Sequence, residues 1–233
     1  MKVAALTAIA GFYLVTSASI AEAASLSTSG TWTNIVAAPI GGTISGAGTS
    51  SISWGTPATG SGQSGYDFVG VAEDVSMTDL IDSAFLLGTF THRNFPISGT
   101  SLDTATLNVD FSLDTFSQTF SFGFDHFETP NNANPCPAGG APPCPDLVSF
   151  PNATSSEFVT IEGVNYNLTL TGFSQGGASN AVDAFLTLEG QSNSAGLYAM
   201  LTEVEGEAVP EPSGLVGLAA IGGLVTVLRR KKG

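Results

Sequence analysis

Positive charge is the scarcest feature of this chain, whose 233 residues include 20 acidic residues but only six Lys and Arg. Five of the six lie near the ends, so Arg93 is the only cation between residues 24 and 208. The same interval contains 18 carboxylates and is therefore about 17 units negative (18 − 1). Because nothing there can neutralise phosphates, the composition excludes nucleic acid as a partner and opposes binding to anionic lipid.

Side chains that commonly perform catalysis are also rare in this interval. It has no lysine, only two histidines, His92 and His126, and no Gly-x-Ser-x-Gly nucleophile motif. A Ser–His–Asp triad or a pair of glycosidase carboxylates would have to be assembled by the fold, and no such pair stands out among the acids. We therefore expect a non-catalytic protein, and a secreted glycan hydrolase is the least favoured alternative.

Cysteine is limited to Cys136 and Cys144, which enclose a loop rich in proline and glycine. The prolines favour a turn that brings the two sulfurs together. Zinc is a competing explanation, but no histidine lies inside the loop to complete a metal site. The pair predicts a disulfide, which would form in an oxidising compartment outside the cytoplasm.

The first 23 residues have the features of an export signal. Lys2 is followed by an uncharged apolar run, Val3–Val15, and then by Ala21 and Ala23 at the two positions that a signal peptidase reads. The run is too short to span a bilayer, so it predicts a cleaved signal peptide over residues 1–23 instead of an anchor.

The last 25 residues, 209–233, have a different composition. A Pro-Glu-Pro tripeptide precedes 16 uncharged residues, 213–228, which would span about 24 Å as a helix, and four cations follow. The segment predicts a transmembrane helix with its cationic end in the cytoplasm, and an ordinary tail anchor is the alternative. The residues of this terminal pattern are Pro210, Glu211, Pro212, Arg229, Arg230, Lys231 and Lys232.

This terminal pattern resembles the PEP-CTERM sorting signal of Gram-negative bacteria. The resemblance implies cleavage by an exosortase, a membrane peptidase, and a link to exopolysaccharide and biofilm. The implied route runs from a precursor anchored in the inner membrane to the cell surface or extracellular matrix. The leading functional hypothesis is thus a non-catalytic matrix protein, and the alternative is a carbohydrate- or calcium-binding module with a defined ligand site.

Residues 24–208 show hydrophobic alternation of period two and no long helical period, which predicts strands with one wet face. They suit one domain, and we expect an all-β, two-sheet antiparallel sandwich of jelly-roll-like type. A short helix is possible at Met77–Ser83, and residues 41–65 are expected to form loops and edge strands. The expected strands cover 31–36, 51–54, 66–71, 85–91, 107–113, 120–125, 147–150, 158–161, 166–171, 184–188 and 197–201.

A second resemblance rests on Thr91, His92, Arg93 and Asn94, which match the motif that names the THxN family of PEP-CTERM proteins. The segment from Phe124 to Asn131 and the following cysteine loop are also similar to that group. The resemblance implies no biochemical activity, so it supplies no catalytic residues.

Two metal sites can be drawn from these segments. His92 and His126 could bind a metal with Asp125 or Glu128, because imidazole and carboxylate are common ligands. Oxygens from Asp125, Glu128, Asn131 and Asp146 could instead bind calcium. The alternatives are histidines that stabilise turns by hydrogen bonding and carboxylates that are simply solvated.

Two further expectations concern aromatic residues and the one arginine between residues 24 and 208. Trp32 and Trp54, with Tyr66 and Tyr198, could form an aromatic platform for sugar rings, although such residues more often lie in the core. Arg93 is expected to pair with a carboxylate in the segment that contains the other histidine: Asp125, Glu128 or Asp146.

Overall fold

The computed structural model describes residues 23–39, 42–151, 153–161 and 163–204. The predicted signal peptide lies outside these ranges except for Ala23, and the predicted sorting signal lies outside them entirely. No helix within the described ranges is long and apolar enough to cross a membrane.

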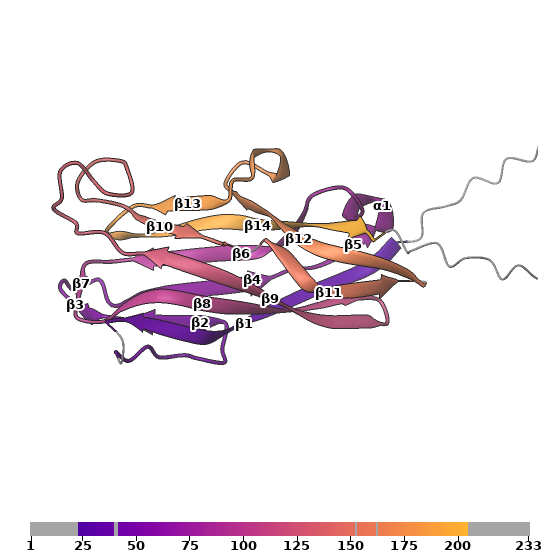
Figure 1. The fold of residues 1–233 in the computed structure, drawn as a ribbon, viewed down its shortest axis with the longest axis horizontal. Helices are drawn as coiled ribbons and strands as arrows, with labels where there is room; N and C mark the ends of the chain where they lie inside the picture. Colours follow the sequence, from indigo (N-terminus) through magenta and orange to yellow (C-terminus); the bar gives the residue numbers. More distant parts are fainter. Residues whose placement is uncertain (1–22, 40–41, 152, 162, 205–233) are drawn as a thin grey trace, which may run out of the picture.

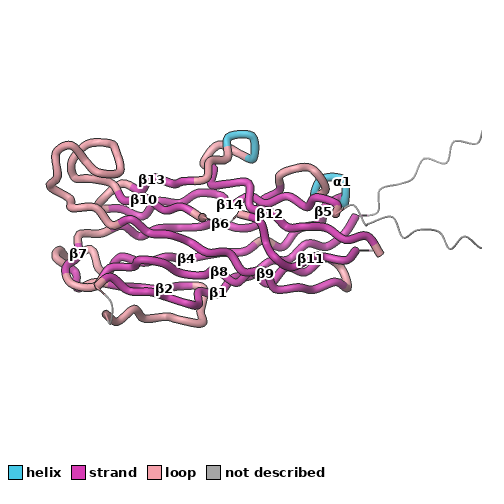
Figure 2. The backbone as a smooth tube through the Cα atoms, viewed as in Figure 1, coloured by secondary structure: helices cyan, strands magenta, loops and turns pink. Residues whose placement is uncertain are grey.

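The described residues form two six-stranded sheets whose paired strands are all antiparallel, together with a small two-stranded ribbon (Figures 1 and 2). The first sheet has the order β13-β10-β9-β8-β1-β5, the second the order β11-β12-β14-β6-β4-β2, and the ribbon pairs β3 with β7. The elements are β1 (Ala23–Ala38), β2 (Ser51–Trp54), β3 (Thr56–Pro57), β4 (Ser64–Gly70), β5 (Ala72–Ser76), α1 (Met77–Leu80), β6 (Phe85–Asn94), β7 (Ile97–Ser98), β8 (Ser101–Leu113), β9 (Phe116–Phe127), β10 (Asp146–Ser149), β11 (Thr154–Ile161), β12 (Val164–Ser174), the 3-10 turn η1 (Ala178–Asn180), β13 (Ala184–Thr187) and β14 (Gln191–Glu203).

Side-chain alternation explains why these segments form half-buried strands. On β9, Phe120, Phe122 and Phe124 are buried, whereas Ser121 and Asp125 face solvent. A strand places successive side chains on opposite faces, so this pattern gives β9 one apolar face. The neighbouring strand β8 has the same alternation, and the two strands pair along ten residue positions from Thr104↔Asp125 to Leu113↔Phe116.

The core lies between the two sheets and is largely aromatic. Trp32 of β1 and Phe124 of β9 come from the first sheet, and Phe90 of β6 and Phe173 of β12 come from the second. Phe124 has its ring centroid 5.2 Å from Trp32, 5.8 Å from Phe90 and 6.0 Å from Phe173. These contacts join the facing surfaces, and the prediction of an all-β fold with two antiparallel sheets is confirmed.

The structure differs from the expected elements at several edges. Strand β1 begins at Ala23, although its first half is a Ser- and Thr-rich stretch with few large apolar residues, and β5 is a largely exposed edge strand. Both segments lack the apolar alternation that marks the central strands, so no strand was expected there. The predicted short helix is present but ends at Leu80.

The strands run along the long axis of the molecule, which gives it two distinct ends (Figure 1). Strand β1 begins and β14 ends at one of them, beside α1. The opposite end, which we call the loop end, carries the β9–β10 connection of residues 128–145 and the β13–β14 connection of residues 188–190. The candidate site lies between the sheets at the loop end.

Candidate metal centre

Three strand residues bring ligand-type side chains together at the loop end. His92 lies near the end of β6 in one sheet, while His126 and Asp146 lie at the end of β9 and the start of β10 in the other. All three are buried, and one ligand atom from each lies within 4.8 Å of the others. The site therefore spans the two sheets, and it unites the two histidines as the sequence suggested.

The hydrogen bonds of His92 identify its free nitrogen. Thr187 of β13 donates its hydroxyl proton to the backbone carbonyl of Asp146 at 3.2 Å, so this hydroxyl accepts from His92 Nδ1–H, at 2.8 Å. Nδ1 thus carries the proton and Nε2 a lone pair, which has no hydrogen-bond partner among the described residues. Burial, followed by the neighbouring His126 and Arg93, lowers the pKa of His92 well below its ordinary value, which favours the neutral ring.

The second histidine is fixed by a phenol and a carboxylate. His126 Nδ1 lies 2.7 Å from the Tyr66 hydroxyl, and its Nε2 lies 3.3 Å from a carboxylate oxygen of the half-buried Glu128. Burial is the largest cause that raises the pKa of Tyr66, so the phenol stays protonated. A phenol can donate or accept, and it can therefore satisfy either tautomer of His126.

Asp146 adds a buried carboxylate to the pair of rings. Its Oδ1 accepts from the Thr129 backbone N–H at 2.8 Å, whereas its Oδ2 is buried and has no hydrogen-bond partner among the described residues. Burial, and next the charge of Glu128, raise the pKa of Asp146 to about 7. Burial and Glu128 likewise raise the pKa of Glu189, in the β13–β14 connection, to about 7. Three carboxylates thus repel one another beside the two imidazoles.

The other two predicted ligands, Asp125 and Asn131, lie in different places relative to the site. Asp125 precedes His126 on β9 and therefore points out of the opposite face, where it is exposed. Asn131 lies in the β9–β10 connection, where its side-chain oxygen Oδ1 is buried. Its backbone carbonyl accepts a hydrogen bond from the Cys144 N–H at 3.0 Å. The sequence did not reveal the roles of Thr187 and Glu189, since neither lies near a histidine along the chain.

The motif residues 91–94 form the end of β6 and alternate between the core and the surface. His92 and Asn94 point inward, and the Asn94 amide donates to the backbone carbonyl of Thr187 at 3.0 Å. Thr91 faces outward and its hydroxyl lies 2.8 Å from that of Ser194 on β14. The interpretation of these histidines as turn-stabilising residues was wrong, because both lie on paired strands and contact side chains of other elements.

Arg93 pairs with a carboxylate, but not with one of the three expected. Its Nε donates to Asp67 on β4 at 2.8 Å, and one terminal nitrogen donates to Ile52 O and Ser53 Oγ on β2, each at 3.0 Å. The expectation of Asp125, Glu128 or Asp146 was wrong because alternation along β6 turns Arg93 away from the face that carries His92.

The two tryptophans do not offer a surface to a sugar. Trp32 and Trp54 are both fully buried, and Trp54 stacks on His92 with ring centroids 5.8 Å apart and planes inclined by 25°. Tyr66 is also buried, with its centroid 5.1 Å from that of His92. Trp54 and Tyr66 therefore wall the histidine site, and Trp32 packs in the core against Phe124, so these three residues form no exposed platform.

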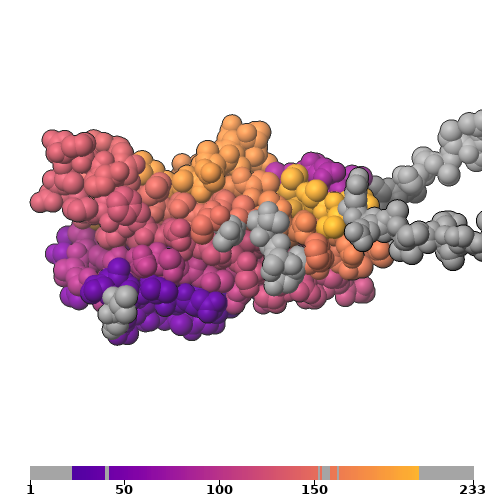
Figure 3. Space-filling model, viewed as in Figure 1, coloured from indigo at the N-terminus to yellow at the C-terminus, as the bar shows by residue number. Residues whose placement is uncertain are grey.

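Cys136 and Cys144 form the predicted disulfide within the β9–β10 connection. This connection makes a lobe at the loop end (Figure 3). The Thr129 hydroxyl donates to Pro145 O at 3.0 Å, so both ends of the connection meet beside Asp146. The disulfide therefore braces the segment that carries Glu128 and Asn131.

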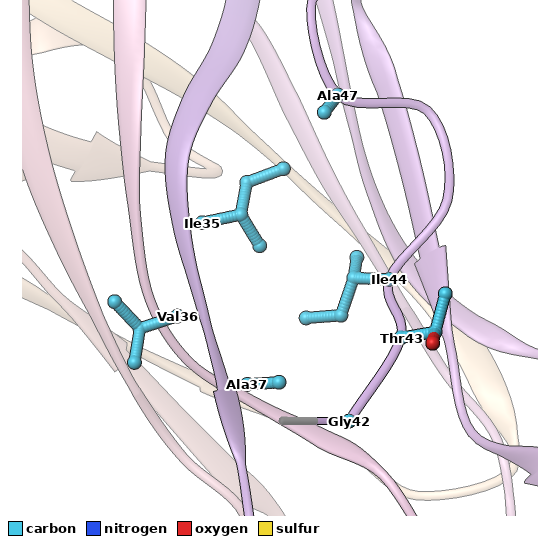
Figure 4. A pocket seen from close by; sticks show the side chains of 7 residues that line it. All are labelled: Ile35, Val36, Ala37, Gly42, Thr43, Ile44 and Ala47. Atoms are coloured by element: carbon cyan, nitrogen blue, oxygen red, sulfur yellow. The ribbon is translucent and has the colours of Figure 1, made fainter. Parts of the chain in front are cut away.

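A separate hollow of about 480 Å³ lies between β1 and the segment that follows it. Ile35 and Ile44 point toward one another across it, whereas Val36 points away (Figure 4). Its lining is Ile35, Val36, Ala37, Gly42, Thr43, Ile44 and Ala47, none of which ionises. This hollow offers no acid–base or metal chemistry, unlike the histidine site.

The chemistry available at the histidine site is metal binding. Two imidazoles and a carboxylate are the donor set of many zinc and other transition-metal sites, whereas calcium prefers six to eight oxygens. Among known proteins, no family model matches this chain, and no curated protein matches its sequence.

Proposed function

We propose that the chain is an exported bacterial surface protein that is processed at both ends. Signal peptidase removes residues 1–23, and exosortase cleaves near Pro210–Pro212 to release an inner-membrane precursor to the cell surface or extracellular matrix. The observation that carries this proposal is the Cys136–Cys144 disulfide, because such bonds persist in oxidising compartments outside the cytoplasm. The order of the terminal features in the sequence supports the same route.

The proposed mature protein is a non-catalytic, jelly-roll-like two-sheet body that associates with exopolysaccharide. Its charge of about −17 over residues 24–208 (18 acids, one Arg) keeps it soluble and separate from other anionic surfaces. An acidic glycan would meet this body through divalent cations, whereas a neutral glycan would need only hydrogen bonds. Co-sedimentation of the mature protein with the host's exopolysaccharide, with and without calcium, tests the association.

Processing has its own test. In a host with an active exosortase, intact mass should show a mature chain that starts near Ala24 and ends near Pro210. Glu211→Ala should leave an uncleaved precursor in the inner membrane, while Glu207→Ala, an identical change outside the tripeptide, should be processed normally. Full-length chain as the only species at the inner membrane would overturn the proposal.

The alternative function is a module with a defined ligand site. The burial of Trp32 and Trp54 disfavours a glycan platform, while the cluster of His92, His126 and Asp146 favours a metal site. A glycan hydrolase ranks third, and turnover of a purified glycan by the mature protein would reverse this order.

A further inference from the structure

The charge balance at the loop end calls for a cation that the chain does not supply. A carboxylate oxygen of Glu128 lies 3.3 Å from His126 Nε2, and Asp146 places a carboxylate oxygen within 4.8 Å of a ring nitrogen of each histidine. Arg93 is the only Lys or Arg in the described part of the chain, and its guanidinium points away toward Asp67. Like charges in a partly buried site are unfavourable unless a positive partner is present.

Two buried atoms with free lone pairs also indicate that a positive partner belongs in this site. Nε2 of His92 and Oδ2 of Asp146 are buried without hydrogen-bond partners among the described residues. An unsatisfied buried polar atom destabilises the folded state, so a core selected only for stability would place apolar side chains here. Both atoms carry lone pairs, which a hydrogen-bond donor or a metal ion can satisfy.

We propose that His92, His126 and Asp146 bind a divalent transition-metal ion of the zinc class, with Glu128 as an oxygen donor at the solvent edge. His92 and Asp146 offer Nε2 and Oδ2. His126 offers Nε2, since its Nδ1 is engaged by Tyr66. Glu128 already touches this nitrogen and is 28% exposed, so it lies where an ion can enter.

The distances are compatible with such an ion. Zinc bonds of 2.0–2.1 Å in a tetrahedron place donor atoms about 3.4 Å apart. One ligand-type atom from each of the three residues lies within 4.8 Å of the others, so side-chain shifts of about 1 Å would bring three donors to this spacing. The other ring nitrogens already have the outer partners that orient metal-bound imidazoles, Thr187 for His92 and Tyr66 for His126.

The donor set selects the class of metal. Imidazole nitrogens suit zinc, cobalt, nickel and copper, whereas calcium needs a larger shell of oxygens. The sequence-based calcium site also included Asp125, which is exposed on the opposite face of β9. We therefore assign the site to a transition metal, and the bound ion links the two sheets because His92 and His126 belong to different ones.

The test uses the full-length chain in mild detergent, stripped with EDTA and titrated with Zn²⁺ or Co²⁺. We expect one equivalent to bind, with a visible absorption band for bound Co²⁺. Co²⁺ should also quench Trp54, which stacks on His92. Zn²⁺ at 100 times its Kd should raise Tm by about 5–10 °C. Millimolar Ca²⁺ should neither displace Zn²⁺ nor reproduce the shift.

Matched variants separate this site from nonspecific binding by an acidic protein. Asp146→Asn keeps an acceptor for Thr129 N–H and should weaken Zn²⁺ binding at least about 100-fold, and Glu128→Gln about 10-fold, an effect typical of a peripheral ligand. Asp125→Asn removes the same charge from the exposed face beside His126 and should change Kd less than about threefold.

Three outcomes would overturn the proposal. They are the absence of stoichiometric Zn²⁺ or Co²⁺ binding by the folded wild type, equal losses in Asp146→Asn and Asp125→Asn, and displacement of Zn²⁺ by millimolar Ca²⁺. Glu128→Gln guards against a folding artefact, because Glu128 is half-buried. These outcomes are independent of exopolysaccharide binding, so failure of one proposal leaves the other standing.

Discussion

Arg93→Ala should remove a polar clamp across three strands of one sheet. The side chain starts on β6, pairs with Asp67 on β4 and reaches Ile52 O and Ser53 Oγ on β2. Gly65 permits this path, because a Cβ there would collide with the guanidinium of Arg93 and with the backbone carbonyl of Ile52. The clamp thus fastens the edge strand β2, which carries Trp54, to the rest of its sheet.

The size of the loss follows from exposure. The side chains of Arg93 and Asp67 are 26% and 32% exposed, so the ion pair itself is worth at most about 1 kcal/mol. The hydrogen bonds to β2 add about 1 kcal/mol in total after exchange with water. We expect Arg93→Ala to lower the free energy of unfolding by about 2 kcal/mol and Tm by about 5 °C.

Urea unfolding of Arg93→Ala, Asp67→Ala and the double variant measures these terms. The coupling energy between the two residues should be at most about 1 kcal/mol and should shrink in high salt. Arg93→Lys should be intermediate, since an ammonium cannot reproduce the planar fork. A loss below about 0.5 kcal/mol, or one of 3–5 kcal/mol as for a buried pair, would refute this reasoning.

Three further predictions concern the core and the loop end. In EDTA-treated protein the free energy of unfolding should rise as pH falls from about 7 to about 4. Asp146 and Glu189 have folded-state pKa values of about 7, against ordinary values of 3.8 and 4.5. Because the folded state therefore binds more protons than the unfolded state in this range, a lower pH favours folding. Urea midpoints across this range test it, and Asp146→Asn should flatten the dependence. Replacing Cys136 and Cys144 together with Ala should lower unfolding free energy by about 2.5 kcal/mol, the chain-entropy value for so short a loop, and equal midpoints would contradict it. Phe124→Ala should cost about 3–5 kcal/mol by thermal or urea unfolding, since its ring packs in the aromatic core, and a loss below 1 kcal/mol would place it outside the core.

The sequence predicted those strands in which buried apolar side chains alternate with polar ones. Phe120, Phe122 and Phe124 alternate with small or polar residues, and this pattern alone indicated β9. Strand β5 at Ala72–Ser76 could not be predicted this way, because an exposed edge strand is defined by its backbone pairing with β1 and not by apolar side chains.

The candidate site was accessible only in part. His92 and His126 stood out because the body has no other histidines, and Asp146 was named as a possible ligand. Their grouping depends on two sheets packing face to face, which no local pattern specifies. The same packing moved Trp54 from a possible surface platform to the wall of the site, and alternation on β6 gave Arg93 a partner that the sequence did not suggest.

The placement of both described chain ends at one end of the molecule determines how a tethered copy would stand. Strand β1 has 16 residues, which at about 3.3 Å each span roughly 50 Å. A copy held through either flanking segment would project the β9–β10 lobe and the histidine site about that far from its support (Figure 1). A dense layer of such molecules would present the loop end outward, within reach of neighbouring cells and dissolved ions. The faces of the sheets would then lie against those of neighbouring copies.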